Sequence, residues 1–207
     1  MTTSKHPWEN IYRQDGWPQR EPVPLFYEAV PAFQSRKCRR ILDLGCGNGN
    51  YIVPFAEKGF DVTGMDISGT GLNISKRRLE TAAMPVSLVQ GDFRFPLPFR
   101  ESSFDGIWSL QSIHHARISE IRLVIRELWR VLTRRGFMVL SVSGRKDDDC
   151  SYEEIEPGTY VPLEGPAQGL PHHIFTESEV REEFQMFAIE DVFSRLGGQV
   201  IVVMASK

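Results

Sequence analysis

The chain has 207 residues, of which 41% are hydrophobic, and its formal net charge at pH 7 is −3. This length predicts one domain with a buried core, and the charge provides no basic field that would attract nucleic acid or an anionic membrane. A polar N-terminus and the lack of any apolar run of about 18 residues argue against a signal peptide and a membrane span.

The first segment comprises residues 1–35, of which residues 1–20 are polar but carry Trp8, Tyr12 and Trp17. Two prolines at positions 22 and 24 can open a helix that continues to about Phe33. Large aromatic side chains are costly to leave in a polar tail, so we expect this arm to fold over a ligand site as a lid. The alternative is ordinary packing of an N-terminal arm on the domain.

Short apolar runs alternate with helical patterns through the middle of the chain. The expected strands are 41–44, 60–65, 86–90, 104–109 and 137–142, and the expected helices are 50–58, 71–83 and 118–132. The buried face of the last helix should be formed by Leu123, Ile125, Leu128, Trp129 and Leu132. This alternation predicts a parallel sheet with helices on both faces.

The C-terminal segment, residues 176–207, departs from this alternation. Its apolar runs 187–193 and 199–205 are separated by only five residues, too few for a helical crossover, so they should form an antiparallel hairpin. The predicted fold class is therefore α/β: a Rossmann-like, doubly wound, seven-stranded sheet, mostly parallel, with a C-terminal antiparallel hairpin.

A long connection, residues 143–175, contains acidic residues, four prolines and several glycines. Connections longer than about 15 residues without secondary structure are usually functional lids or disordered segments. Because it follows the fifth strand, we expect it to cover a substrate, the alternative being a mobile surface insertion. The single domain 1–207 is thus divided into an arm (1–35), a cofactor-binding core (36–142), this loop, and a C-terminal helix and hairpin (176–207).

Residues 41–49 read Ile-Leu-Asp-Leu-Gly-Cys-Gly-Asn-Gly, and Asp66 ends the next strand 19 positions after Gly47. An apolar strand, a glycine-rich turn and a later carboxylate for a ribose describe a nucleotide-type βαβ unit. A dinucleotide loop would need a glycine at position 50, where Asn50 stands. Asp43 would repel a pyrophosphate but suits an ammonium and a sulfonium group, which points to S-adenosylmethionine.

Five motifs, taken in order, resemble those of class I S-adenosylmethionine-dependent methyltransferases. They lie at residues 43–49, 62–68, 91–93, 104–109 and 132–137. The last departs from the family's Leu-x-Pro-Gly-Gly turn, because Thr-Arg-Arg stands at 133–135. The resemblance implies methyl transfer from S-adenosylmethionine, with S-adenosylhomocysteine as product. Residues 8–12 are similar to tellurite-resistance and thiopurine-type enzymes, which implies a small-molecule acceptor.

The resemblance also implies the cofactor contacts. The loop glycines should let the backbone approach the cofactor and offer N–H groups, while Asp66 accepts from the ribose hydroxyls. Asp92 would accept from the adenine amino group, Phe93 would meet the base, and the backbone of Ser109 and Leu110 would hold the ammonium. The alternatives are a helix N-cap for Asp66 and a turn carboxylate for Asp92. The full expected set is Tyr12, Asp43, Gly45, Gly47, Gly49, Asp66, Ile67, Asp92, Phe93, Ser109 and Leu110.

Two histidine pairs, His114 with His115 and His172 with His173, follow the fourth strand and end the long loop. Histidine can accept a proton near neutral pH, so His115, His172 or His173 is expected to act as a base, the alternative being a structural role. Cys46 should be a small packing residue, since direct methyl transfer needs no nucleophilic cysteine. The three cysteines lack metal-ligand spacing, which predicts no metal and favours the cytoplasm.

Two other functions stay open, namely a protein or RNA methyltransferase and a non-catalytic cofactor-binding subunit. The fourth strand is followed by Ser-Leu-Gln-Ser at 109–112. This run lacks the Asn/Asp-Pro-Pro-aromatic sequence of base amino-group methylation and the cysteine of cytosine C5 methylation, which disfavours nucleic acid. A monomer or a homodimer is expected.

Overall fold

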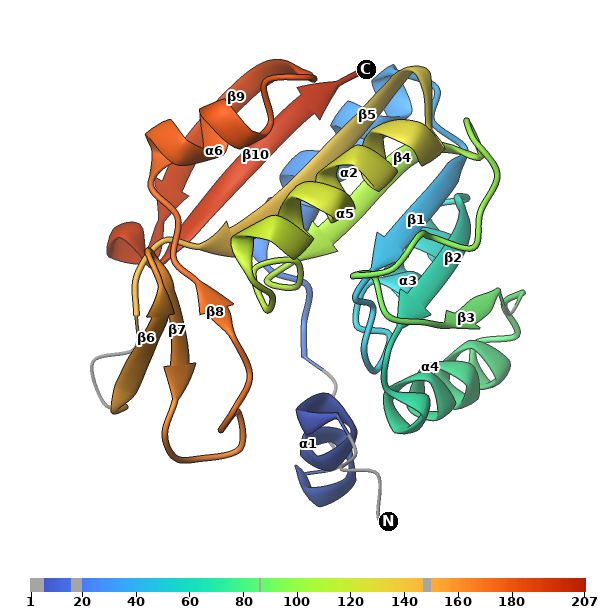
Figure 1. Cartoon of the computed structure of the whole chain (residues 1–207). Helices are drawn as coiled ribbons and strands as arrows, with labels where there is room; N and C mark the ends of the chain where they lie inside the picture. Colours follow the sequence, from blue (N-terminus) through green and yellow to red (C-terminus); the bar gives the residue numbers. More distant parts are fainter. Residues whose placement is uncertain (1–5, 16–19, 86, 147–149) are drawn as a thin grey trace.

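The computed structural model describes residues 6–15, 20–85, 87–146 and 150–207. The main sheet contains β1 (Arg40–Leu44), β2 (Asp61–Asp66), β3 (Leu88–Gln90), β4 (Phe104–Leu110), β5 (Leu132–Ser143), β9 (Ala188–Arg195) and β10 (Val200–Ser206). Its seven strands follow the order β3-β2-β1-β4-β5-β10-β9 (Figure 1). The strands β1 to β5 are parallel, and β10 is antiparallel to both β5 and β9. The predicted fold class and its C-terminal hairpin are confirmed.

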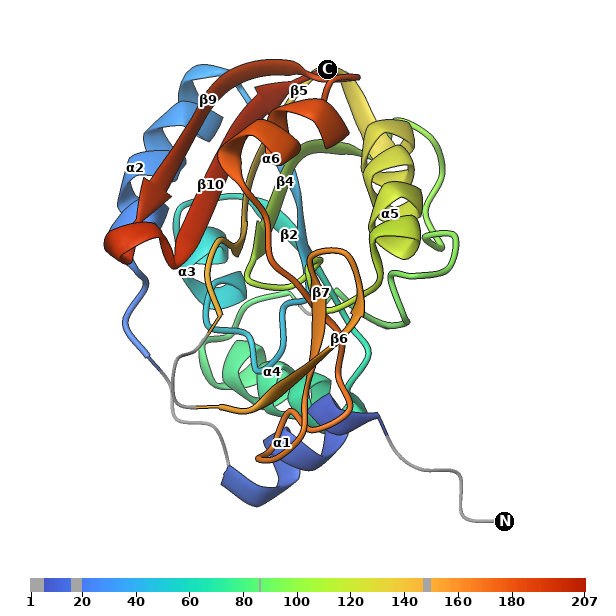
Figure 2. The same cartoon turned by 60° about the vertical axis from the view of Figure 1, so that its left-hand side comes forward.

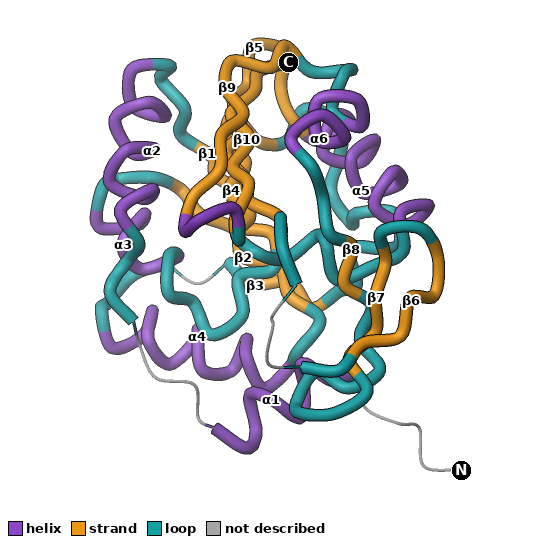
Figure 3. Tube along the Cα trace, turned by 90° about the vertical axis from the view of Figure 1, so that its left-hand side faces the viewer, coloured by secondary structure: helices purple, strands orange, loops and turns teal. Residues whose placement is uncertain are grey.

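Helices cover both faces of this sheet, as Figure 3 shows. They are α1 (Pro7–Asp15), α2 (Pro24–Ser35), α3 (Ile52–Glu57), α4 (Gly69–Thr81), α5 (Ile118–Val131) and α6 (Glu177–Glu183). Residues of α2, α3 and α4 share one apolar core, and those of α5 and α6 share the other. The helix α1 lies below the main sheet, beside α4 (Figure 1).

The order of the strands fixes where a ligand can bind. From β1 the chain first builds β2 and β3 on one side, then returns to build β4 on the other side. In open α/β sheets, such a switch point leaves a crevice outside the carboxyl ends of the two strands that flank it. The loops after β1 and β4 open into this crevice.

Aromatic packing joins α2 to one face of the sheet, near the first residues of β4. Phe33 is fully buried, and its ring lies 5.9 Å from that of Phe55 and 5.4 Å from that of Phe137, both edge to face. The strand β4 passes close beneath, because a Cβ at Gly106 would lie 2.3 Å from Ile41 Cδ1 and 2.9 Å from the Phe33 ring.

The helix α5 corrects one sequence prediction. Ile125, Leu128 and Leu132 are buried, and Trp129 is partly buried, but Leu123 is 47% exposed. Leu123 stands two positions from Ile125, which turns it about 200° around a helix, away from the face that packs on the sheet. The expectation that it belongs to the buried face was wrong.

The strand β5 starts earlier than the sequence pattern predicts. It begins at Leu132, directly after α5, rather than at Phe137. Arg135, which stands where a glycine is usual in the family turn, adopts a left-handed φ of 69°. The kink separates the first residues of the strand from Gly136, and the register between β4 and β5 shifts there.

The sequence pattern predicts a loop without secondary structure over residues 143–175, but the structure has strands there. The segment contains β6 (Tyr152–Glu156), β7 (Thr159–Pro162) and β8 (His172–His173), which form a second, antiparallel sheet. Figure 2 shows this small sheet in front of the loops at the lower end of β4 and near α1. Its strands are short and separated by prolines, so they give no clear alternating pattern.

The N-terminal arm contains a helix, α1, that was not predicted from its sequence. The predicted residues Trp17 and Val86 lie outside the described part of the chain. No helix within the described ranges is long and apolar enough to cross a membrane.

Truncation of Phe33 tests the aromatic packing. We expect Phe33→Ala to lower the free energy of unfolding by about 3–5 kcal/mol, because the cavity it leaves is enclosed by rigid rings. Tyr27→Ala on the same helix, where the side chain is 56% exposed, should cost less than about 1 kcal/mol. Urea unfolding of both variants measures the difference, and equal losses would contradict the packing argument.

Candidate active site at the carboxyl edge of the sheet

The glycine-rich loop after β1 is packed against other segments of the chain. Gly45, Gly47 and Gly49 have left-handed φ values of 77°, 52° and 79°. A Cβ at Gly45 would lie 1.9 Å from Ser112 Oγ, and one at Gly47 would lie 2.0 Å from the Tyr12 hydroxyl oxygen. Glycine is therefore required both by the backbone conformation and by the lack of space.

The amide groups of this loop are bonded within the protein, which differs from the expectation that they face the cofactor. The Gly45 and Cys46 amides donate to Met65 O at 2.8 and 3.1 Å. The Gly47 amide donates to Asp66 Oδ2 at 2.8 Å, and the Gly49 amide donates to Cys46 O at 2.9 Å. The loop glycines thus shape the site rather than offering free N–H groups.

Asp66 ties the loop to the end of β2. Besides the Gly47 amide, its carboxylate accepts the Ser68 amide at 2.8 Å on Oδ1. The helix N-cap is Ser68 itself, whose hydroxyl accepts from the Gly71 amide, so Asp66 does not fill that alternative role. Asp66 is 9% exposed and lines a cavity beside the loop.

This cavity, which we call the loop cavity, has a volume of about 210 Å³. Seven of the eleven predicted cofactor contacts line it, namely Tyr12, Asp43, Gly45, Asp66, Ile67, Phe93 and Leu110. Ile67 also lines an adjoining cavity of about 290 Å³, with His6, Glu9, Gly69 and Gln90. The structure therefore gathers most of the predicted residues around the loop cavity.

The other four predicted contacts do not line the loop cavity. Gly47 and Gly49 are not among its lining residues, and neither is Ser109, whose predicted contact is through the backbone and whose hydroxyl donates to Leu44 O at 2.8 Å. Asp92 forms an ion pair with Arg94 at 2.6 Å. A carboxylate already held by a guanidinium has less capacity to accept a hydrogen bond from an adenine amino group.

Asp43 is the electrostatic centre of the loop cavity. It is 2% exposed, and its Oδ2 has no hydrogen-bond partner among the described residues. Burial, together with the nearby Asp66 carboxylate, raises the pKa of Asp43 to about 8. An unpaired buried carboxylate is costly, so this position favours a ligand that brings a positive charge.

A second and larger cavity, which we call the histidine cavity, adjoins the first and has a volume of about 700 Å³. The two cavities share Trp8, Gln111 and His115. Gln111 adopts a left-handed φ of 48°, and its amide donates to Ser141 O at 3.0 Å. A strained residue at the junction of two cavities is typical of a functional site.

Three imidazoles line the histidine cavity in mutual contact. The ring of His115 lies 4.0 Å from that of His114 and 4.5 Å from that of His172, and the Trp8 ring lies 5.0 Å away on its edge. Burial is the main cause that lowers the pKa of all three, to about 3 for His114. At neutral pH these rings are therefore uncharged, and the same burial makes each of them a weaker base than a free imidazole.

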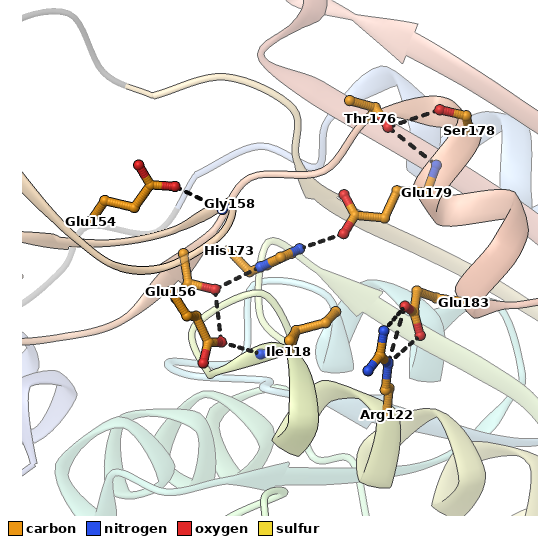
Figure 4. Close-up of polar contacts among 11 residues, drawn as sticks. Ile118, Arg122, Glu154, Glu156, Gly158, His173, Thr176, Ser178, Glu179 and Glu183 are labelled. Carbon is orange, nitrogen blue, oxygen red and sulfur yellow. Dashed lines mark hydrogen bonds and ion pairs between the residues drawn. The ribbon is translucent and has the colours of Figure 1, made fainter.

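His173 occupies a different environment from its neighbour. It is 1% exposed, with Nδ1 at 2.7 Å from Thr159 Oγ1 and Nε2 at 2.9 Å from Glu179 Oε1 (Figure 4). It does not line the histidine cavity. Of the three predicted bases, the structure brings His115 and His172 together and places His173 behind them.

The helix α1 forms one wall of both cavities and is held by a residue that sequence analysis missed. The Glu9 carboxylate accepts from Ser68 Oγ and Thr70 Oγ1, both at 2.7 Å, and from the Thr70 amide at 3.1 Å. Burial acts to raise the pKa of Glu9, but these bonds and the Arg13 charge outweigh it and lower the pKa to about 2. The aromatic residues Trp8 and Tyr12 were the only signal for this helix.

The metal prediction bears on the same cavities. Within the described ranges, no group of three or more His, Cys, Asp or Glu side chains is placed to hold a metal ion.

Comparison with known proteins adds to this geometry. Residues 41–136 match the family described as a methyltransferase domain. The chain is 34% identical over 109 residues to 27-O-demethylrifamycin SV methyltransferase of Amycolatopsis mediterranei, covering 49% of this chain and 37% of that protein. It is 26% identical over 173 residues to fatty-acid O-methyltransferase of Mycolicibacterium smegmatis, covering 82% and 59%. The chain thus spans less than two thirds of either relative.

A solved structure shows the same fold over nearly the whole chain. The 1,6-didemethyltoxoflavin-N1-methyltransferase of Burkholderia thailandensis, solved with its substrate and S-adenosylhomocysteine, has a TM-score of 0.72 at 20% identity, covering 96% of this chain and 83% of that one. The seven-stranded sheet therefore has the Rossmann-like fold of this solved structure. The family match covers the glycine loop and β4, and the chain is similar over these segments to methyltransferase domains.

Replacement of Asp43 tests its buried environment. The pKa of Asp43 is about 8 in the folded protein and about 4 when unfolded, so between these values the folded state holds the extra proton. Stability should therefore fall as pH rises from about 5 to 8, by up to about 1 kcal/mol per pH unit. Asp43→Asn should remove this contribution, while Asp61→Asn at the exposed start of β2 should not.

Urea unfolding at several pH values, without ligand, measures this effect. A constant difference in unfolding free energy between the wild type and Asp43→Asn over that range would contradict it.

Proposed function

We propose that the protein transfers a methyl group from S-adenosylmethionine to a nucleophilic atom of a small molecule. The single observation that carries this proposal is the junction of the two cavities at Trp8, Gln111 and His115. A cofactor in the loop cavity and an acceptor in the histidine cavity would meet there. The volume of about 700 Å³ is of the size that holds a small organic ligand.

The loop cavity suits this cofactor by charge. Asp43 supplies an unpaired buried carboxylate for the ammonium group, and Asp66 keeps acceptor capacity for the ribose hydroxyls beyond the two amides it already binds. The face of Phe93 would meet the adenine, and Tyr12 would cover the loop. The predicted contacts at Asp92 and Ser109 stay predictions, with weaker support from their geometry.

Catalysis would rest on alignment and on a proton acceptor. The cofactor supplies an activated methyl group, and the acceptor atom must lie in line with the methyl carbon and the sulfur, with water excluded. As the new bond forms, a proton of the acceptor's hydroxyl or amino group would pass to the neutral imidazole of His115 or His172. The carbon–sulfur bond breaks, which leaves S-adenosylhomocysteine and the methylated product.

The named functions of relatives support a small-molecule acceptor. One is named as a methyltransferase of 27-O-demethylrifamycin SV, and another is named as a fatty-acid O-methyltransferase. A hydroxyl acceptor would use the uncharged imidazoles, because it has a proton to lose. Methylation of a macromolecule and a non-catalytic role are the outcomes that turnover assays separate from this proposal.

Cofactor binding tests the first half of the proposal. Saturating S-adenosylmethionine should raise the melting temperature, whereas NADH should not. Asp66→Ala should weaken binding by on the order of 2–4 kcal/mol in calorimetry, since hydrogen bonds to a charged group are lost. Asp61→Ala, at the other end of the same strand, should bind like the wild type. Wild-type affinity in Asp66→Ala would refute the assignment.

Turnover tests the second half. Formation of S-adenosylhomocysteine should be screened against phenols, amines, thiols and chalcogen oxyanions. With an accepted hydroxyl compound, His115→Gln should lower kcat by roughly 10²–10⁴ while cofactor affinity is retained. Because burial lowers the pKa of His115, the wild-type rate should be level at neutral pH and fall only on acidification. A rate that His115→Gln leaves unchanged would exclude it as the base.

A further inference from the structure

The imidazole of His173 joins the second sheet to the C-terminal part of the fold. Its Nδ1 meets Thr159 Oγ1 on β7, and its Nε2 meets Glu179 Oε1 on α6 (Figure 4). Both contacts are buried at the histidine end, where the side chain is 2% exposed. A buried ring with two hydrogen bonds to two different elements fixes the distance between those elements.

The chain of bonds continues from Thr159 to the start of α5. The Thr159 hydroxyl donates to Glu156 Oε1 at 3.0 Å, and the same oxygen accepts the Ile118 amide at 2.9 Å. The Glu156 carboxylate also accepts from Arg117 at 3.2 Å. The hydrogen-bonded chain therefore runs through the side chains of Glu179, His173, Thr159 and Glu156 to the first residue of α5. It holds β6 and β7 against α5 and α6.

A backbone bond ties the same residue to the histidine cluster. The His173 amide donates to His114 O at 2.8 Å. Because β8 pairs with β7 through Thr159 opposite His173 and Tyr160 opposite His172, adjacent side chains of β8 point to opposite faces. His173 thus points into the bonded network, and His172 lines the cavity 4.5 Å from the ring of His115.

We propose that His173, with Thr159 and Glu179, is a positioning residue that sets His172 opposite His115. The network fixes the second sheet relative to the loop after β4, and the spacing of the two cavity histidines follows from it. This inference rests on the proposed function, because the distance between the His115 and His172 rings matters for catalysis only if one of them accepts the proton. The positioning group itself does not touch the acceptor.

A matched pair of variants separates the hydroxyl from the volume at Thr159. Thr159→Val keeps the shape of the side chain but removes both of its hydrogen bonds, and Thr159→Ser keeps the hydroxyl. We expect Thr159→Val to lower kcat on the order of 10- to 100-fold through misplacement of His172, with cofactor affinity within about twofold of the wild type. Thr159→Ser should recover most of the rate.

Two further variants complete the design. Glu179→Gln changes the partly exposed end of the network and leaves no cavity, because glutamine has nearly the same volume as glutamate. It should lower kcat as Thr159→Val does. The control is Glu183→Gln, which removes the nearby Arg122–Glu183 ion pair between α5 and α6 but touches neither histidine (Figure 4). Its rate and cofactor affinity should match those of the wild type.

A readout without turnover keeps the inference distinct from the proposed function. The ring ¹⁵N resonances of His115 and His172, measured by NMR, should shift in Thr159→Val and Glu179→Gln but not in Thr159→Ser or Glu183→Gln. If the wild type methylates no acceptor, the proposed function fails and these resonances still decide on positioning. Unchanged resonances in Thr159→Val, or equal losses of cofactor affinity and kcat, would overturn the inference.

Discussion

The site depends on three glycines, Gly45, Gly47 and Gly49, because other side chains occupy the space where their Cβ atoms would stand. Where a Cβ would stand on each loop glycine, the chain places a side chain from elsewhere, namely Ser112 after β4, Tyr12 on α1 and Ser75 on α4. The Ser75 hydroxyl also donates to Gly47 O at 2.8 Å. Three segments distant in sequence therefore converge on one turn, and a side chain on that turn would drive them apart. With the amides of Gly45, Cys46 and Gly47 bonded to residues of β2, the loop holds a fixed position against which these segments pack.

The two cavities differ in the ionisable side chains that line them: an aspartic acid in the loop cavity and imidazoles in the histidine cavity. The loop cavity contains the buried carboxyl group of Asp43, whose Oδ2 has no hydrogen-bond partner among the described residues and whose raised pKa keeps it mostly protonated at neutral pH, while the rings of the histidine cavity are uncharged. A cationic ligand in the first cavity relieves the cost of burying Asp43, and loss of a methyl group turns a sulfonium into a neutral thioether. On the proposed function, the product therefore leaves the carboxylate less well compensated than the substrate did, which favours exchange.

Much of the fold follows from pattern alone. The alternation of apolar runs and helices is sufficient for the parallel core, and the five-residue gap at 194–198 is sufficient for the terminal hairpin. The second sheet was missed because its strands are short and interrupted by prolines, so their pairing depends on tertiary contacts such as that between Thr159 and His173. Leu123 was wrongly assigned to the buried face because the spacing of apolar residues alone does not show where that face of the helix ends.

The site was predictable where chemistry is tied to a motif, and less so elsewhere. The loop and the carboxylate that ends β2 have fixed spacing, so Asp43, Asp66 and Phe93 were found together in one cavity. Gln111 has no motif, and its importance comes from a backbone conformation that no residue type reveals. His172 and His173 are indistinguishable in sequence, and only the alternation along β8 separates one that lines a cavity from one that is bonded on both sides.

The attachment of α1 bears on both ligand sites at once. The same short helix carries Glu9, which is bonded to the start of α4, Tyr12, which covers the glycine loop, and Trp8, which lines both cavities. Any displacement of α1 that opens the loop cavity also removes part of the wall around the acceptor. On the proposed function, the cofactor and acceptor sites share this wall, so α1 couples the filling of one site to the filling of the other.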